Sequence, residues 1–305
     1  METRDIEYIL AVAAHGGIGR AAEALGISQP ALTKAVQRVE AQAGLPLFER
    51  TANGIAATYA GTRFLERARR IQLEYQDGIK EMLGIRTGEQ GILRVGYSPS
   101  IPGDVILGAC QQLVRERPVA RLRLRRRLAR DLLDLLAAGE LDMAVAPTPS
   151  GALADTFAVQ PLFDDRLVVV ADQGHALLRR RKLRLADLAD QEWLLPERHI
   201  TLRQQVDAAF RQRGLPEPQP RIEIDFGSSS LFALMQGTQM LSIANAGGEA
   251  MQRGLRELPL GVEELDLRRR IGVVTRAGAY LSPLAQRLTE LLREHSRDPG
   301  IPCLA

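Results

Sequence analysis

The sequence predicts a small all-α N-terminal domain followed by a larger α/β region. Three observations support this fold class. The chain has 305 residues, enough for about two domains. Apolar residues in the first part recur at helical spacing between glycines, whereas the chain from residue 91 onward alternates short apolar strands with amphipathic helices. The hydrophobic fraction of 45% and the charged fraction of 25% are ordinary for a globular protein.

Composition also excludes several classes of protein. Apolar runs such as 167–171 are far shorter than the roughly 18 residues that span a bilayer, so we expect no membrane partner. Acidic residues before the first apolar stretch have the wrong sign for a secretory signal, which favours a cytoplasmic protein. Cys110 and Cys303 have no metal-ligand spacing, so we expect neither a metal site nor a disulfide, and we expect Cys110 in a core.

The first sixty residues predict three short helices. Apolar residues at i, i+3, i+4 and i+7 indicate a helix over 5–14, and a second helix is expected over 18–25, each ended by glycine. Ser28 is suited to cap a third helix over 29–42, and Pro30 is tolerated in its first turn, where no intrahelical bond needs the missing N–H. Helix, glycine turn and capped helix is the pattern of a helix-turn-helix.

The third helix has one apolar and one polar face. At about 100° per residue its apolar side chains fall within a narrow arc, which leaves a polar set exposed. Such side chains suit the DNA major groove, because amides pair with adenine, threonine contacts thymine, and basic groups bind phosphate or guanine. The alternative is a solvated amphipathic helix. The candidates for DNA contact are Gln29, Pro30, Thr33, Lys34 and Arg38.

A short hairpin is expected after this helix, because Asn53-Gly54 is typical of a two-residue turn between strands. With this feature the first sixty residues resemble the LysR-type transcriptional regulators. The residues that carry the resemblance are Arg20-Ala21-Ala22, Ser28 to Thr33, Leu45 to Arg50 and Thr58 to Gly61.

The resemblance implies a winged helix-turn-helix over residues 1–60 that binds double-stranded promoter DNA. This domain contains five basic and six acidic residues, so it is not basic in sum. Four of the acids, Glu2, Asp5, Glu7 and Glu23, precede the recognition helix in the sequence, and we expect them to lie away from it. Because local charge sets the attraction for phosphate, these acids would then not prevent DNA binding. By the resemblance the DNA contacts are Ser28, Gln29, Pro30, Thr33, Lys34 and Arg38, with Arg50 and Thr51 at the wing.

Residues 58–88 predict a long linker helix, since the segment lacks proline. In the family such a helix pairs two chains, which implies a homodimer to homotetramer on an inverted-repeat operator. The alternative is a helix packed on its own domain. The expected coiled-coil seam, with Gly78 at its missing position, comprises Phe64, Ala68, Ile71, Tyr75 and Met82.

The remaining chain predicts alternating strands and helices, an α/β pattern with parallel strands. Three segments resemble the effector-binding half of the same family, which is built like a periplasmic binding protein: 139–142, 161–165 and 185–193. That architecture implies one subdomain of residues 91–162 plus 268–295, a second of 163–267, and a tail of 296–305. The expected strands cover 93–97, 122–124, 141–146, 167–171, 193–195, 221–226, 240–244 and 270–275, and the expected helices 104–116, 131–138, 201–213 and 231–236.

A small ligand is expected beyond the carboxyl ends of these strands, where open α/β sheets bind ligands. Hydroxyl groups, arginines and helix N-termini follow several strands, and they suit a small carboxylate or other anion. Each serine has the alternative role of capping a helix. The candidate ligand residues are Ser98, Ser100, Thr148, Arg198, Thr201, Arg203 and Ser228.

No catalytic motif supports an enzyme. The sequence Gly17 to Ala22 fits a dinucleotide fingerprint, but a helix precedes it where a strand is required, so we expect no cofactor. The alternatives are an enzyme assembled from distant residues and a stand-alone solute-binding protein, which leaves the first ninety residues without a role. We therefore expect a transcriptional regulator that binds DNA and a small metabolite, with RNA polymerase as a further partner.

Overall fold

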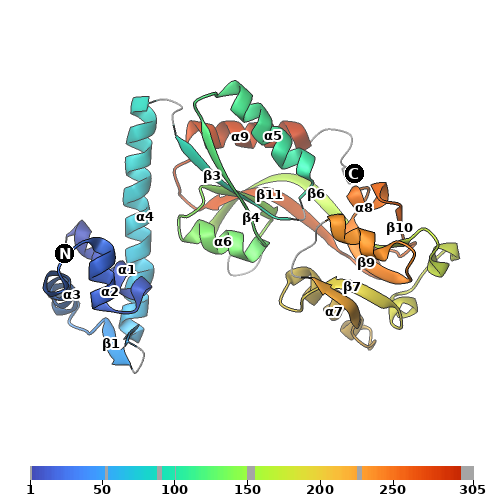
Figure 1. Cartoon of the computed structure of the whole chain (residues 1–305), viewed down its shortest axis with the longest axis horizontal. Helices are drawn as coiled ribbons and strands as arrows, with labels where there is room; N and C mark the ends of the chain where they lie inside the picture. Colours follow the sequence, from blue (N-terminus) through green and yellow to red (C-terminus); the bar gives the residue numbers. More distant parts are fainter. Residues whose placement is uncertain are drawn as a thin grey trace. The chain divides into compact units, whose positions relative to one another are not determined.

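The computed structural model describes residues 2–51, 54–87, 91–99, 101–149, 155–224 and 229–296. The chain divides into two compact units, residues 1–88 and 89–305, which Figure 1 shows in blue to cyan and in teal to red respectively. Among the described residues, no helix combines the length and apolar character that a bilayer requires.

The first unit confirms the three predicted short helices and the long fourth one. A two-stranded antiparallel hairpin lies between the third and fourth helices in the sequence, with Phe48 paired to Ala57 and Thr51 to Gly54. The turn residue Asn53, on which the hairpin prediction rests, lies outside the described residues. The elements are α1 (Thr3–His15), α2 (Ile18–Leu25), α3 (Gln29–Ala43), β1 (Phe48–Thr51), β2 (Gly54–Ala57) and α4 (Tyr59–Thr87).

Glycine ends the first two helices for a conformational reason. Gly16 and Gly26 have φ angles of 60° and 65°, the left-handed region that other residues rarely adopt. The turns bring three amphipathic helices around one core, in which Ile9, Leu32 and Val39 are at most 2% exposed. The apolar face predicted for α3 is therefore the face that packs.

The second unit contains one nine-stranded sheet with helices on both faces. Its helices are α5 (Gly103–Glu116), α6 (Ala129–Ala137), α7 (Thr201–Gln212), α8 (Glu249–Gln252) and α9 (Pro283–Ser296), with 3-10 turns at 176–179, 185–188 and 229–235. Its strands are β3 (Ile92–Tyr97), β4 (Arg121–Arg126), β5 (Met143–Pro147), β6 (Phe157–Asp172), β7 (Glu192–Pro196), β8 (Pro220–Ile224), β9 (Met240–Asn245), β10 (Leu255–Glu257) and β11 (Arg268–Arg276).

The expectation of parallel strands is correct for only part of the sheet. The strands β3, β4 and β5 are parallel to one another, as are β7, β8 and β9. In contrast, β11 is antiparallel to β5 and β6, and β6 is antiparallel to β9. The two long central strands lie between two parallel groups, and each runs against the group that it borders: β11 against β5, and β6 against β9.

Two sets of hydrophobic cores divide along these central strands. Phe163 and Ile271 belong to a core that α5 and α9 cover, whereas Leu167 belongs to a core that contains Trp193 and Phe210. The long strand β6 thus passes from one core to the other within four residues. The second unit thus has separate hydrophobic cores on the two sides of residues 164–166 of β6 and 268–270 of β11, which we call the crossover residues, and we call the two sides its halves.

Three elements were not predicted: α8, β10 and α9. The last is amphipathic and buries Leu284, Leu288 and Leu292 beside α5. Ser296, which we expected to begin a frayed tail, is the buried last residue of α9, and residues after it lie outside the described part. Cys110 is buried in the α5 core, as predicted.

Candidate nucleic-acid interface and ligand site

Helix α3 presents the predicted polar set on its exposed side. The Ser28 hydroxyl accepts the backbone N–H of Ala31 at 3.4 Å and caps the helix. Gln29, Pro30 and Lys34 are exposed. Thr33 is half-buried, and its hydroxyl donates to the carbonyl of Gln29 at 2.9 Å. Gln29, Pro30 and Lys34 are therefore accessible on α3, whereas Thr33 lies at the border of the packed face.

Arg38 lies on the same helix, and its half-exposed side chain has a partner within the protein. Its guanidinium pairs with the carboxylate of Asp5, which is only 1% exposed. The expectation that the acidic residues of α1 lie away from the recognition helix is therefore wrong for Asp5. The packing of α1 against α3 brings these residues together, and no spacing within the sequence indicates that contact.

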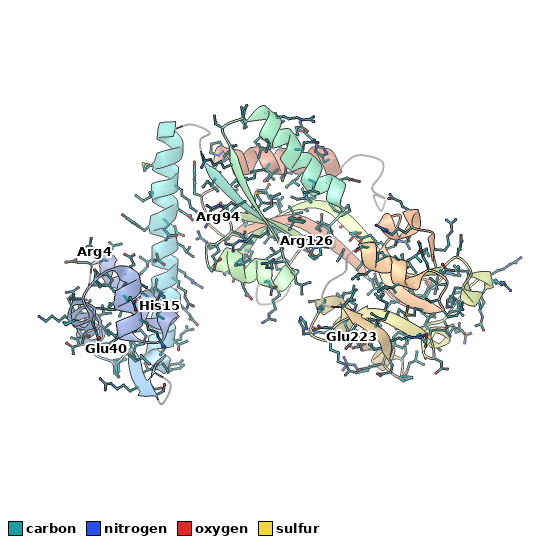
Figure 2. All side chains as sticks on the ribbon, viewed as in Figure 1. Arg4, His15, Glu40, Arg94, Arg126 and Glu223 are labelled. Carbon is teal, nitrogen blue, oxygen red and sulfur yellow. The ribbon has the colours of Figure 1, made fainter. Side chains whose placement is uncertain are left out.

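The hairpin is attached to the recognition helix by a side chain that sequence reasoning missed. Glu40, labelled in Figure 2, projects from α3 and accepts the backbone N–H groups of Leu47 at 2.8 Å and Phe48 at 3.2 Å. Arg50 and Thr51 are exposed on β1, as a wing requires. The carboxylate thus links the start of the wing to the helix that would enter the groove.

Two residues of the family pattern have clear structural roles. Arg20 donates to the carbonyls of His15 at 2.8 Å and Gly16 at 2.9 Å, which satisfies the end of α1. The Thr58 hydroxyl donates to the carbonyl of Pro46 at 2.7 Å and accepts the N–H of Gly61 at 2.9 Å, so it caps α4. The Thr58 bonds thus hold together the two ends of the hairpin segment, and the N–H of Ile55 in β2 donates to the carbonyl of Gly16 at the end of α1 at 3.1 Å.

The expected seam on α4 is exposed only in its second half. Ala68 is buried, and Phe64 is half-buried against the hydrophobic core of the first unit. Neither side chain is therefore fully available to a partner chain. Beyond them, α4 carries large apolar side chains on one side, each at least 46% exposed. These side chains are Ile71, Tyr75, Ile79 and Met82.

In the second unit, two predicted ligand residues follow neighbouring parallel strands. Ser98 follows β3, is 5% exposed, and donates its backbone N–H to Val145 at 3.0 Å. Thr148 follows β5, and its methyl group lies beside Gly272. Because β3 and β5 pair in register, their carboxyl ends adjoin. Ser100 and Ser228 lie outside the described residues.

The segment after β7 divides between solvent and core. Arg198 is 63% exposed and 3.9 Å from Glu217, and Thr201 is exposed at the start of α7. We expected Arg203 to offer its charge to a ligand, but its side chain is fully buried. It donates to the carboxylates of Asp207 at 2.8 Å and Glu223 at 3.2 Å, as well as to two proline carbonyls. Burial with these partners gives Arg203 a structural role.

The crossover residues carry ion pairs that sequence reasoning also missed. Asp165 accepts hydrogen bonds from Arg269 at 2.6 and 2.8 Å and from the amide of Asn245 at 2.9 and 3.0 Å. Asp164 pairs with Arg270 at 3.1 Å. Asn245 ends β9 in one half of the unit, so the bonds of Asp165 connect that half with the crossover.

The described residues hold no cluster of histidine, cysteine, aspartate or glutamate side chains suited to a metal ion. Cys110 is 5% exposed, and burial raises the pKa of its thiol to about 11. Because the thiolate is the reactive form, burial and the raised pKa both lower the reactivity of this thiol.

Two family models match the chain. The model described as "Bacterial regulatory helix-turn-helix protein, lysR family" matches residues 3–62, and the model described as "LysR substrate binding domain" matches residues 86–297.

Known proteins are similar along most of the chain. It is 29% identical over 224 residues to the HTH-type transcriptional regulator GbpR of Azospirillum brasilense, which covers 73% of this chain and 66% of GbpR. It is 29% identical over 303 residues to the hydrogen peroxide-inducible genes activator of Pectobacterium carotovorum subsp. carotovorum, covering 97% of each.

Solved structures share the fold at lower identity. A full-length OxyR variant from Pseudomonas aeruginosa has a TM-score of 0.65 at 23% identity, covering 98% of this chain and 95% of that one. Full-length CbnR complexed with its target DNA has a TM-score of 0.57 at 22% identity, covering 97% of this chain and 100% of that one.

Proposed function

Because the chain belongs to the LysR family of DNA-binding transcriptional regulators with an effector-binding domain, we propose that α3 enters the major groove of its operator. Gln29 and Thr33 contact base edges there, and Lys34 contacts a phosphate. The observation that carries this proposal is the capped helix α3, which packs its apolar residues into the core and leaves Gln29 and Lys34 exposed, with Thr33 half-buried between them.

The wing supplies sequence-independent affinity in this proposal. Arg50 and Thr51 meet the sugar-phosphate backbone or the minor groove, with Ser28 and Pro30 near the phosphates at the start of α3. The proposal is supported by the bonds from Glu40 to the wing, which hold the hairpin at a fixed position beside the recognition helix.

A second copy of the chain pairs through α4. The exposed apolar stripe of Ile71, Tyr75, Ile79 and Met82 spans an arc of about 80° at 100° per residue, which suits a helix-helix seam. Burying these side chains against a partner removes them from water. A homodimer, or a homotetramer of two such dimers, then places two recognition helices on an inverted repeat.

The second unit binds a small anionic metabolite, most simply a carboxylate. The proposed contacts are Ser98, Ser100, Thr148, Arg198, Thr201 and Ser228, and Arg203 is left to its structural role. Support comes from the adjoining ends of β3 and β5 and from the exposed start of α7, which lie where α/β sheets bind ligands.

Ligand binding favours one orientation of the two halves of the second unit. The two cores are separate along β6, and polar crossover residues join them, so the halves have a natural boundary for rotation. Through the dimer, this rotation alters the spacing of the DNA-binding domains and the contact with RNA polymerase. The protein works in the cytoplasm as a binding protein without catalytic activity.

Sensing of peroxide by a thiol is the alternative suggested by the relative from Pectobacterium carotovorum subsp. carotovorum. The burial and raised pKa of Cys110 disfavour this cysteine as the sensor, because oxidation requires an accessible thiolate. The second cysteine, Cys303, lies outside the described residues. Our proposal of a non-covalent effector rests on the polar residues at the ends of β3 and β5 and at the start of α7.

Two measurements test the proposed function. The full-length protein should retard a DNA fragment from upstream of its own gene, with affinity that falls as salt rises. A panel of small carboxylates should include one that raises the melting temperature of the parent but not of a Ser98→Trp variant with unchanged DNA affinity. Absence of retardation at low salt refutes the DNA part, and equal stabilisation of both proteins refutes the ligand site.

A further inference from the structure

A buried carboxylate on α1 holds an arginine of the recognition helix. Asp5 Oδ2 accepts the Nε–H of Arg38 at 3.3 Å, and Oδ1 accepts an Nη2–H of the same guanidinium. Asp5 Oδ2 also accepts the backbone N–H of Glu2 at 2.8 Å, which closes the first turn of α1. The bond to Glu2 therefore fixes the carboxylate of Asp5 on its own helix, independently of its bonds to Arg38.

The carboxylate remains charged in this position. Burial by itself would raise the pKa of Asp5, but the hydrogen bonds from Arg38 and from the backbone of Glu2 outweigh it, so the pKa lies below its ordinary value. A charged carboxylate holding two N–H groups of one guanidinium is a bidentate pair, which fixes the plane of that group. Arg38 is thus held in one orientation.

The other half of the guanidinium stays available. The side chain of Arg38 is 49% exposed, and within the described part of the chain the bonds to Asp5 use only Nε and Nη2. Arg38 stands one helical turn after Lys34 on the exposed side of α3. It is the tenth residue of the helix Gln29–Ala43, far from the N-terminal turn that contacts base edges in helix-turn-helix proteins. A phosphate is therefore the acceptor that suits its position.

We propose that Asp5 is a positioning residue for DNA binding: it orients the guanidinium of Arg38 toward a backbone phosphate. An unrestrained arginine loses rotational freedom when it binds, and the pair with Asp5 imposes that order before DNA arrives. The opposite effect of the same contact is charge cancellation, in which Asp5 weakens the attraction of Arg38 for DNA. The two effects have opposite signs in a binding experiment.

The experiment measures binding of full-length variants to the upstream fragment and to a random duplex of equal length, over a salt series. Asp5→Asn keeps oxygen and shape but removes the charge that holds Arg38. We expect it to weaken binding to both duplexes by about 3- to 10-fold. Arg38→Gln should weaken both at least as much and lower the salt slope by about one. The double variant should bind like Arg38→Gln alone, because Asp5 acts only through Arg38.

Glu7→Gln is the matched control, since Glu7 is exposed on the same helix and its change removes one negative charge without touching Arg38. It should leave binding unchanged or slightly tighter. Arg38→Lys retains the charge but not the planar fork, and should recover less than half of the free energy lost in Arg38→Gln.

Three results would overturn the proposal, the last of which is full recovery of affinity by Arg38→Lys. Tighter binding of Asp5→Asn to both duplexes means charge cancellation, and additive losses in the double variant mean that Asp5 acts on α1 instead. Thermal unfolding shows whether Asp5→Asn has a folding defect. If it has one, the binding of Arg38→Lys tests the proposal instead, because full recovery of affinity by lysine excludes a need for an oriented guanidinium.

Discussion

Glu40 and Leu47 are joined by a hydrogen bond of 2.8 Å from a backbone N–H to a carboxylate, and this bond connects the recognition helix with the wing. A second bond, from the N–H of Phe48, goes to the same oxygen at 3.2 Å. One side chain therefore satisfies two backbone donors at the point where the chain leaves the turn and enters β1.

Replacing Glu40 by alanine should destabilise the first unit. The two N–H groups would lose their partner, and an unsatisfied buried donor costs about 1 to 3 kcal/mol. Glu40→Gln, which keeps an acceptor oxygen, should lose less than half of that. Denaturant unfolding of both variants checks the difference, and equal losses would show that charge rather than hydrogen bonding stabilises the wing.

Gly61→Ala should be strongly destabilising, because an added Cβ would lie 1.9 Å from the carbonyl oxygen of Leu47. Relieving this clash requires a backbone shift, with a cost of about 3 kcal/mol. Gly78 provides the control on the same helix α4, since nothing lies within 4 Å of its added Cβ. Gly78→Ala should stabilise the helix by about 0.5 to 1 kcal/mol. Comparable melting temperatures for the two variants would contradict the close approach.

Gln29→Ala should relax sequence preference without abolishing binding. Loss of a bidentate contact to one base is worth about 1 to 3 kcal/mol of discrimination at that base pair. Lys34→Ala should instead weaken binding to all sequences and reduce the salt slope by about one. Competition assays against single-base operator variants measure both effects. A uniform loss in Gln29→Ala would remove Gln29 from the set of base-reading residues.

Cys110 should resist alkylation in the folded protein. With its pKa raised to about 11, only about one thiol in a thousand is ionised at pH 8. Iodoacetamide labelling followed by peptide mass analysis should show slow modification in buffer and fast modification in urea. A Cys110→Ala variant should keep the response to effector. Stoichiometric oxidation of native Cys110 by hydrogen peroxide would instead support thiol-based sensing.

Acid should weaken the contact between α5 and α9. Arg287 donates two hydrogen bonds to Glu116, at 2.8 and 2.9 Å, and these bonds are the main reason why the pKa of Glu116 falls from 4.5 to about 2. Since the folded pKa is the lower one, the stabilisation is complete above about pH 4.5 and disappears as the pH falls toward 2. Glu116→Gln should flatten the stability profile in that window. An unchanged profile would assign acid sensitivity to other carboxylates.

Much of the fold could be predicted because its signals are local. The spacing of Ile6, Ile9, Leu10 and Ala13 predicted α1, and Ser28 with Pro30 predicted the start of α3, since caps and amphipathic faces involve residues within a few positions of one another. The prediction of parallel strands was wrong for β11, because strand direction depends on residues that are distant in the sequence. An apolar strand does not indicate the direction of its neighbour, which here depends on β5 and β6 far away in the sequence.

The candidate sites divide in the same way. Gln29, Thr33 and Lys34 were predicted as DNA contacts from the pattern of one helix, and they stay a prediction, whereas the contacts of Asp5, Glu40 and Arg203 could not be predicted in that way. Arg203 and Arg198 are both arginines after the same strand, yet one is fully buried and the other 63% exposed. Arg203 points toward partners on its own helix, on β7, on β8 and on the loop before β8, and this placement makes the difference.

The sequence by itself determined the helices of the first unit, most strands of the second unit and the family, because these depend on residue spacing within short segments. The tertiary structure decided which charges meet. Asp5 reaches Arg38 across 33 positions and Asp165 reaches Arg269 across 104, and each pair forms only when packing brings two distant segments within hydrogen-bonding distance.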